Sequence, residues 1–496
     1  MHTTLLLDMA ADAAPDRVAL GRIADGLSFA ELRRRAHAGA VALDAQGGET
    51  VVFIGLNGPA MPVAIFAAGL LGKPFAPLNY RLPDTDLRKL LARTAPSVAV
   101  VDDDMIARLG DCPGVTVVSR SAFEAACREI SEVELPYVEP DIGVLLFTSG
   151  TTGEPKAAIL RHANLTSYVI STVEFLGSDE DEAALVSVPP YHIAGISAVL
   201  TGVYGGRRIV HLEAFTPETW VEAATMEQIT HAMVVPTMLG RILDILEERG
   251  AGLPHLKALS YGGGRMPQPV IERALRLLPT VDFVNAYGLT ETSSTVAVLS
   301  PDDHRAAITS TDEAVRRRLG SVGRPLPTLE LEIRGPEGQV MPAGQSGEIY
   351  VRGEQVSGEY THKKVVQDDG WFATNDGGWM DEAGYLFVEG RLDDVIVRGG
   401  ENISPGEIED VLREHPNVAD VAVLGVPDDH WGERVACAVV CKDGQPSVDD
   451  LAAWVKTRLR STKTPELWSF RDALPYNDTG KLLRRQLRTE MSVVGA

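Results

Sequence analysis

The stretch Thr148-Ser-Gly-Thr-Thr-Gly-Glu-Pro-Lys156 follows directly on an apolar run that ends at Phe147. Its two glycines let backbone N–H groups turn towards an anion, its four hydroxyl groups add hydrogen-bond donors, and Lys156 adds a positive charge. The phosphate tail of a nucleotide requires this combination. The string is not a Walker A loop, because Pro155 and Ala157 flank the lysine. The predicted nucleotide contacts of this loop are Thr148, Ser149, Gly150, Thr151, Thr152, Gly153 and Lys156.

Short β-branched runs alternate with helical patterns on both sides of this loop. The runs are 51–54, 98–101, 115–118 and 144–147. Alternation of strands and helices is typical of layered α/β architecture with largely parallel sheets. No period of about 20 to 50 residues recurs, which excludes a solenoid.

The pattern changes from about Gly320. Three short strands, 329–334, 347–351 and 385–389, are separated by Gly and Pro and predict a small β-subdomain. Ser404 to Glu407 then reads as a capping box with Pro405 at the first helical position. Strands at 418–423 and 435–440 and a helix capped by Ser447 complete a compact α+β unit. We predict a large domain over 1–392 and a small one over 393–496, with the boundary near Asp393.

Composition narrows the classes of partner. The chain has 496 residues, 46 Lys+Arg and 69 Asp+Glu, and therefore a net charge of −23. Nucleic acid and anionic membranes both require a basic surface, so neither is expected as the main partner. The four cysteines lack CxxC spacing, which argues against zinc and for a reduced compartment. Residues 1–8 show no signal peptide and the apolar run 60–72 is too short to span a membrane, so we expect a cytoplasmic protein.

The phosphate loop resembles the signature of the adenylate-forming superfamily, which includes acyl- and aryl-CoA synthetases, luciferases and nonribosomal adenylation domains. Further motifs follow in the order found in that family and cover nearly the whole chain. The resemblance implies an α/β fold with a large N-terminal domain of layered α/β sheets, a small β-subdomain, and a small mobile C-terminal α+β domain.

The resemblance also implies an acid-binding pocket. Pro189-Pro-Tyr-His-Ile-Ala-Gly195 is similar to the family's acyl-pocket motif, in which His192 would donate a hydrogen bond to the carboxylate of the acid. Ser260-Tyr-Gly-Gly-Gly264 resembles a turn that adenine and the acyl group approach closely. Family members often have alanine and proline where this chain has Gly264 and Arg265. The implied pocket residues are Tyr191, Ile193, Pro236, Tyr261 and Gly264.

Several motifs resemble the family's nucleotide site. Gly262 and Gly263 would border adenine, and Tyr287 in Tyr287-Gly-Leu-Thr-Glu291 would pack on it. Thr290 would meet the α-phosphate and Glu291 would help to hold Mg²⁺, which takes one or two carboxylates together with phosphate oxygens. Asp376 would accept the ribose hydroxyls, and Arg391 would reach ribose or phosphate. Asn375 stands where the family usually has glycine.

The C-terminal motifs imply movement. Asp393 would be the hinge, and Lys481 in Asn477-Asp-Thr-Gly-Lys481 would be the catalytic lysine, a cation between the attacking carboxylate and the phosphate. After rotation Gly399 and Gly400 would border the CoA tunnel, and Trp431 would border the CoA site. Thr462 stands where many members have an aromatic residue.

We therefore predict an ATP-dependent carboxylate–CoA ligase that uses ATP, Mg²⁺ and coenzyme A, with Lys481, Glu291, Thr290 and His192 as catalytic residues. The expected pocket segments 191–196, 236–239 and 261–264 contain no lysine or arginine to pair a second carboxylate, which favours a hydrophobic monocarboxylic acid, aromatic or medium-chain aliphatic. One alternative keeps adenylation and passes the acyl group to a carrier protein or another nucleophile. Another is a non-catalytic nucleotide-binding protein on the same fold. A homodimer is possible.

Overall fold

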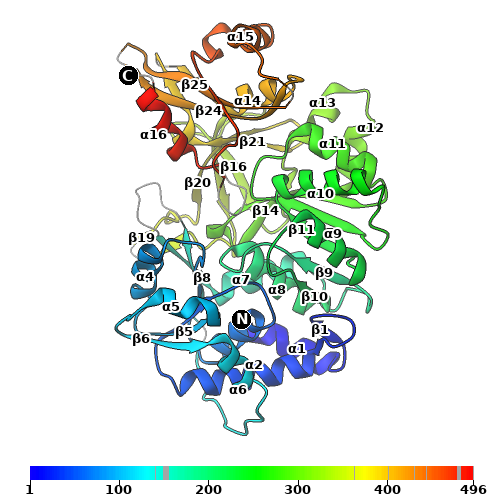
Figure 1. The fold of residues 1–496 in the computed structure, drawn as a ribbon, viewed down its shortest axis with the longest axis vertical. Coiled ribbons are helices and arrows are strands. Elements are labelled where there is room, and N and C mark those ends of the chain that lie inside the picture. The colour runs from blue at the N-terminus through cyan, green and yellow to red at the C-terminus, as the bar shows by residue number, and fades with distance from the viewer. Residues whose placement is uncertain are drawn as a thin grey trace.

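The computed structural model describes residues 1–139, 141–148, 156–361, 363–399, 401–428, 430–442, 444–476 and 482–494, and the statements below concern these residues. The chain runs from two stacked α/β layers at the N-terminal end, through a small antiparallel sheet, to a C-terminal unit at the opposite end (Figure 1). This arrangement agrees with the predicted fold class.

The larger sheet has nine strands in the described part of the chain, and six of them, from β13 to β1, are parallel. Antiparallel strands close both edges. The strands in spatial order are β15 (Arg324–Pro325), β14 (Ser294–Leu299), β13 (Asp282–Leu289), β12 (Ala258–Gly262), β11 (His231–Val234), β9 (Ala183–Val186), β10 (Arg208–His211), β1 (Val18–Leu20) and β2 (Leu27–Ser28).

The second sheet has eight strands among the described residues, with a parallel centre and an antiparallel edge. All four strands predicted from β-branched runs lie in it. In spatial order they are β19 (Lys363–Lys364), β18 (Glu359–Tyr360), β8 (Lys156–Arg161), β7 (Ile142–Thr148), β4 (Phe75–Pro77), β3 (Thr50–Ile54), β5 (Ser97–Val101) and β6 (Val115–Ser119).

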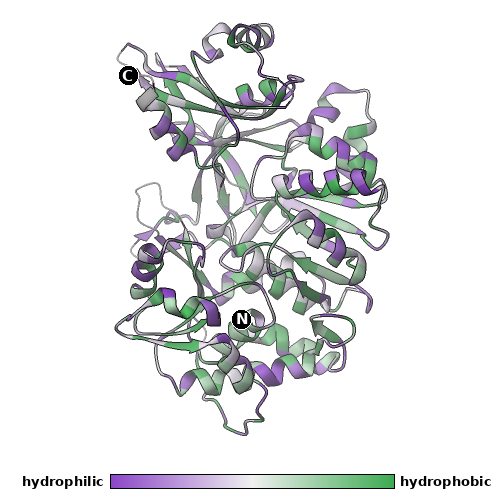
Figure 2. Ribbon diagram, viewed as in Figure 1, coloured by the Kyte–Doolittle hydropathy of each residue, from purple (hydrophilic) through white to green (hydrophobic). Residues whose placement is uncertain are grey.

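The main hydrophobic core lies between these two sheets and is filled by helices. It joins α1 (Thr4–Ala13), α2 (Phe29–Asp44), α3 (Ala60–Leu70), α7 (His162–Thr172) and α8 (Ile193–Gly205) to side chains of both sheets. The apolar run 60–72 is explained by this position, because nearly every residue of α3 is buried. In Figure 2 this helix layer is largely hydrophobic. Among the described residues we find no helix with the length and apolar content of a membrane span.

Outer helices cover the remaining sheet faces. One core packs the nine-stranded sheet against α9 (Pro217–Met226), α10 (Pro236–Arg249) and α11 (Gln268–Leu277). Another packs the eight-stranded sheet against α4 (Asp84–Ala92) and α5 (Ile106–Leu109). The remaining helices of this region are α6 (Arg120–Ala126), α12 (Pro301–Thr309) and α13 (Glu313–Arg317).

The predicted β-subdomain is a four-stranded antiparallel sheet. Its strands are β16 (Glu330–Arg334), β17 (Gly347–Arg352), β20 (Phe372–Met380) and β21 (Leu386–Arg391). A short 3-10 turn, η4 (Leu392–Asp394), connects β21 to the first strand of the next sheet. The predicted domain boundary falls on this turn, where the chain passes from one sheet to another.

The C-terminal unit, from β22 to α16, has its own five-stranded sheet and core. The strands are β22 (Ile396–Arg398), β23 (Glu401–Ile403), β24 (Val418–Asp428), β25 (Gly432–Cys441) and β26 (Leu467–Arg471), and the helices are α14 (Pro405–Arg413), α15 (Val448–Lys456) and α16 (Arg484–Val494). Ser447 caps α15 as predicted. The predicted capping box at Ser404 is wrong, because the Ser404 hydroxyl makes no cap bond and donates instead to the carbonyl of Glu389 on β21, 3.2 Å away.

Candidate active site

A cavity of about 2850 Å³ lies between the nine-stranded sheet, the four-stranded sheet and the C-terminal unit. This exceeds the roughly 300–1000 Å³ that suits one small ligand, so it has room for more than one substrate. The parallel strands β9, β11, β12 and β13 all point their carboxyl ends into it. In parallel sheets this edge is the usual place for ligands, because the loops that follow the strands converge there.

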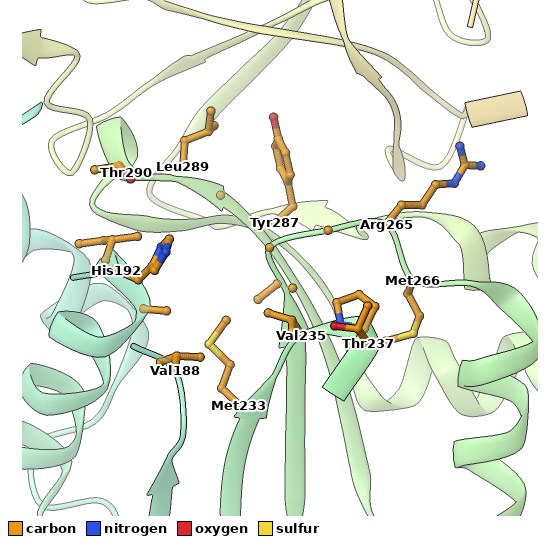
Figure 3. Close-up of a pocket in the computed structure, with 18 of the residues that line it drawn as sticks. Val188, His192, Met233, Val235, Thr237, Arg265, Met266, Tyr287, Leu289 and Thr290 are labelled. Carbon is orange, nitrogen blue, oxygen red and sulfur yellow. The ribbon is translucent and has the colours of Figure 1, made fainter. Parts of the chain in front are cut away.

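One end of the cavity is largely apolar. Val188 follows β9, Met233 lies on β11, and Val235 follows β11; their side chains converge on one space in Figure 3. His192, at the start of α8, points into the same space. Tyr191 stacks edge-on against Tyr80, with 5.7 Å between ring centroids. Of the predicted pocket residues, Tyr191, Ile193, Pro236 and Gly264 line the cavity.

Tyr261 does not line it, which corrects the prediction. Side chains alternate along β12, so Ser260 and Gly262 face the cavity while Tyr261 points to the opposite face. There it is fully buried, and its hydroxyl lies 2.8 Å from Nε2 of His304. Burial raises the pKa of Tyr261, so its hydroxyl stays neutral.

Gly262, Gly263 and Gly264 follow Tyr261, and the structure gives a different physical explanation for each of them. A Cβ on Gly262 would lie 2.3 Å from the carbonyl oxygen of Ala286 on β13, so strand packing requires glycine there. Gly263 has φ +76°, which glycine adopts most readily. A Cβ on Gly264 would meet nothing closer than 3.9 Å, so this residue leaves open space. The turn therefore keeps the backbone accessible beside the cavity.

A buried carboxylate occupies the centre of the site. Asp376 is 7% exposed, and its Oδ2 accepts a hydrogen bond of 2.6 Å from the hydroxyl of Tyr287. Its Oδ1 lies 3.3 Å from Nε of Arg391, whose Nη1 donates to the carbonyl of Thr374. Burial, and then the charge of Asp376, raise the pKa of Tyr287 well above its ordinary value. Strands β13, β20 and β21 thus bring three predicted nucleotide contacts together.

Glu291 lies beside this centre in the turn after β13. Its carboxylate accepts a hydrogen bond from the hydroxyl of Tyr360 on β18, and burial together with Glu291 raises the pKa of Tyr360. Within the described ranges, no group of three or more His, Cys, Asp or Glu side chains is placed to hold a metal ion. One carboxylate facing a nucleotide pocket fits Mg²⁺ held mainly by phosphate oxygens, because Mg²⁺ often takes a single protein carboxylate.

The phosphate loop begins and ends at the cavity. Thr148 and Lys156 are paired at the end of the β7–β8 hairpin where the connecting loop begins and ends, and both line the cavity. Thr290, from the turn after β13, lines it as well (Figure 3). The predicted contacts Ser149, Gly150, Thr151, Thr152 and Gly153 lie outside the described residues, as do Gly400 and Lys481.

The predicted hinge residue has a specific partner. Nδ2 of Asn375 donates a hydrogen bond of 2.8 Å to Oδ2 of Asp393. Asn375 has φ +59°, in the left-handed region that glycine and asparagine tolerate best. The left-handed backbone at this position explains why the family usually has glycine there. Glycine has no side chain, so it could not make the hydrogen bond that Asn375 makes to Asp393.

One surface of the C-terminal unit lines the cavity and another does not. Tyr476 and Leu482 line it. Gly399 and Trp431 lie outside its lining and contact each other. The backbone N–H of Gly399 donates a hydrogen bond of 2.8 Å to the carbonyl oxygen of Trp431. A Cβ on Gly399 would lie 2.8 Å from the indole ring of Trp431. The guanidinium of Arg398 lies 5.4 Å above that indole.

Some lining residues were missed from the sequence. Met233 lies on a short strand and Val235 directly after it, and no motif marks either residue, although Pro236 is a predicted pocket residue. Tyr360 lies 69 positions from Glu291 with no local pattern to connect them. Arg265 was noted only as a departure from the family pattern, whereas it reaches the C-terminal unit.

Comparison with known proteins gives two family matches. Residues 7–361 match the model of the AMP-binding enzyme family, and residues 407–481 match the model of the AMP-binding enzyme C-terminal domain. Feruloyl-CoA synthase from an Amycolatopsis species is 35% identical over 96% of both chains.

Solved structures match over nearly the whole length. O-succinylbenzoate coenzyme A synthetase from Bacillus subtilis, in complex with ATP and magnesium ion, superposes with a TM-score of 0.83 at 29% identity, covering 97% of this chain and 98% of that one. The amide bond synthetase from Marinactinospora thermotolerans has a TM-score of 0.86 at 28% identity, covering 98% and 99%.

The left-handed backbone at Asn375 yields a stability prediction. Asn375→Gly and Asn375→Ala both remove the hydrogen bond to Asp393, but only alanine places a Cβ at φ +59°. We expect the alanine variant to be less stable than the glycine variant by about 1 kcal/mol, measured by denaturant unfolding. Equal stability of the two variants would contradict the role assigned to the backbone conformation.

Proposed function

Because the chain belongs to the AMP-binding enzyme family and is an acid–CoA ligase that forms AMP, we propose that its acid is a hydrophobic monocarboxylic acid, aromatic or medium-chain aliphatic. The observation that carries this proposal is the apolar end of the cavity, where Val188, Met233 and Val235 surround the space that His192 faces. Arg265, the guanidinium labelled in Figure 3, extends away from this apolar end and pairs with Asp410. Because Arg265 is already paired, it is not available to neutralise a second carboxylate on the acid.

The first half-reaction forms acyl-AMP. An oxygen of the acid's carboxylate attacks the α-phosphorus of ATP, a carboxyl–phosphate bond forms, and the bond to the β-phosphate oxygen breaks with release of pyrophosphate. His192 holds the carboxylate by donating a hydrogen bond, and Thr290 donates to the α-phosphate. Lys481, Lys156 and the phosphate loop offset the negative charge that gathers as two anions meet.

Nucleotide binding rests on the buried centre of the site. Asp376 accepts the ribose hydroxyls, Arg391 reaches ribose or phosphate, and Tyr287 packs against adenine beside Gly262 and Gly263. The hydrogen bond from Tyr287 and the nearby Arg391 fix the Asp376 carboxylate before the nucleotide arrives, which supports this assignment. Glu291 would hold Mg²⁺, which offsets the charge of the phosphates when bound.

The second half-reaction forms the thioester. The small domain, 393–496, turns about Asp393 and replaces the surface of Lys481 by that of Gly399 and Gly400. The thiol of CoA then loses its proton, its sulfur bonds to the acyl carbon, and the bond to AMP breaks. Trp431 borders the CoA site. The pairing of Gly399 with Trp431 outside the present cavity lining supports two alternating surfaces. A homodimer and a cytoplasmic location stay predictions from the sequence.

The proposal is tested by an acid panel. We expect ATP–pyrophosphate exchange with hydrophobic monocarboxylic acids and at least about tenfold lower kcat/KM with dicarboxylic acids of similar size, because burying a second charge without a partner is unfavourable. With free CoA, mass spectrometry should detect the acyl thioester. Exchange without thioester would favour transfer to a carrier protein or to an amine, as the name of the amide bond synthetase suggests. No exchange with any acid would contradict the proposed function.

The proposed role of Lys481 predicts a selective loss. Lys481→Ala should slow acyl-AMP formation by about 10²-fold or more, because it removes a cation from the developing charge. Thioester formation from supplied acyl-AMP should change little. Lys89→Ala, at a side chain that is 77% exposed, serves as the control and should leave both steps unchanged. Equal loss in both half-reactions would overturn the role of Lys481.

Met233 predicts how deep the acid reaches. Met233→Trp fills the apolar end, so kcat/KM for the longest acid accepted should fall by roughly tenfold or more, while the shortest acid loses less. Met233→Ala should shift preference towards longer acids. Met226→Ala, at a side chain that is 77% exposed on α9, is the matched control. If both Met233 variants kept the chain-length preference of the natural protein, the proposal that Met233 limits the depth of the acid pocket would be contradicted.

A further inference from the structure

Arg265 connects the acid-binding side of the cavity to the C-terminal unit. It lies in the loop between β12 and α11, directly after the glycines that line the cavity. In Figure 3 its side chain extends away from the apolar pocket. Its guanidinium forms an ion pair with the carboxylate of Asp410 on α14. The pair therefore joins two parts of the protein that are 145 positions apart in the sequence.

The start of α14 is fitted closely to this place. A Cβ on Gly406 would lie 2.5 Å from Nη1 of Arg265 and 3.1 Å from the carbonyl oxygen of Glu389. The hydroxyl of Ser404 donates to that same carbonyl. Glycine at 406 thus allows the helix to approach both Arg265 and β21. The Ser404 bond at the start of α14 and the ion pair of Asp410 further along the helix both hold α14 against the N-terminal part of the chain.

These contacts belong to one orientation of the C-terminal unit. In it, Tyr476 and Leu482, the described residues on either side of the Lys481 motif, line the cavity, whereas Gly399 and Trp431 do not. On the proposed function, this is the orientation for acyl-AMP formation. Rotation about η4 towards the thioester orientation would carry α14 away from Arg265 and Glu389.

We propose that Arg265 is a positioning residue, which holds the C-terminal unit in the acyl-AMP-forming orientation through Asp410 and releases it before thioester formation. The proposal rests on the proposed function. Both side chains are partly exposed, 43% for Arg265 and 41% for Asp410. A pair of this kind shifts an equilibrium by at most about fivefold, so it biases the orientation without locking it.

The test reverses the charges one at a time and together. Arg265→Glu and Asp410→Arg should each slow acyl-AMP formation about two- to fivefold, and should leave unchanged or speed up thioester formation from supplied acyl-AMP. The double variant should restore the rate of the first step, because the pair is rebuilt with opposite polarity. Arg305→Glu is the matched control: its pair with Asp282 has similar exposure, 50% and 49%, but lies within one domain. It should change neither step.

A second measurement does not depend on catalysis. Spin labels at the exposed positions 226 and 448 report the distance between the N-terminal part and the C-terminal unit, measured without substrates. Cys112 and Cys441 are replaced by serine so that they are not labelled. Each single reversal should shift the distance distribution, and the double variant should restore it. Unchanged distributions, failure of the double variant to restore, or equal loss in both half-reactions would overturn the proposal. Absence of acyl-AMP formation by the natural chain would instead contradict the proposed function, while the distance measurement still tests the ion pair.

Discussion

The site depends on the parallel register of β9, β11, β12 and β13. Parallel pairing sends every carboxyl end to the same edge, so residues that are far apart in the sequence converge on one cavity. Close packing of β12 on β13 leaves no room for a side chain at Gly262, which lies against the Ala286 carbonyl. The same packing that orders the sheet therefore exposes backbone at the cavity, and the loops that follow add His192, Thr290 and Glu291.

Positively charged side chains line the cavity although the chain as a whole is negatively charged. The net charge is −23, yet the cavity lining includes Lys156, Arg391 and Arg484. Asp376 is buried there beside the hydroxyl of Tyr287 and the guanidinium of Arg391, and these two contacts keep its carboxylate oriented. A net negative surface disfavours other polyanions, and the proposed nucleotide contacts Lys156 and Arg391 are two of the lining cations.

The described contacts between the C-terminal unit and the rest of the chain are individually weak, as the proposed rotation requires. This interface includes a partly exposed ion pair, a serine–carbonyl bond and, at the predicted hinge, the bond from Asn375 to Asp393. Each is modest, and contacts of this strength can form and break within a catalytic cycle. A large apolar interface would instead hold one orientation throughout.

The sequence by itself determined the family, the order of sheets, and the strands at 51–54, 98–101, 115–118 and 144–147, because local periodicity and short glycine-rich motifs carry that information. Tertiary structure alone decided the rest. Both faces of a parallel sheet are covered by helices, so its strands are apolar on both sides and alternation does not tell which face meets the cavity. The family resemblance placed Tyr261 in the pocket although it packs on His304, and nothing in the apolar strand around Met233 marked that residue as part of the lining. The pairs Arg265–Asp410 and Tyr360–Glu291 join distant segments, and only the folded chain brings those charges and hydroxyls together.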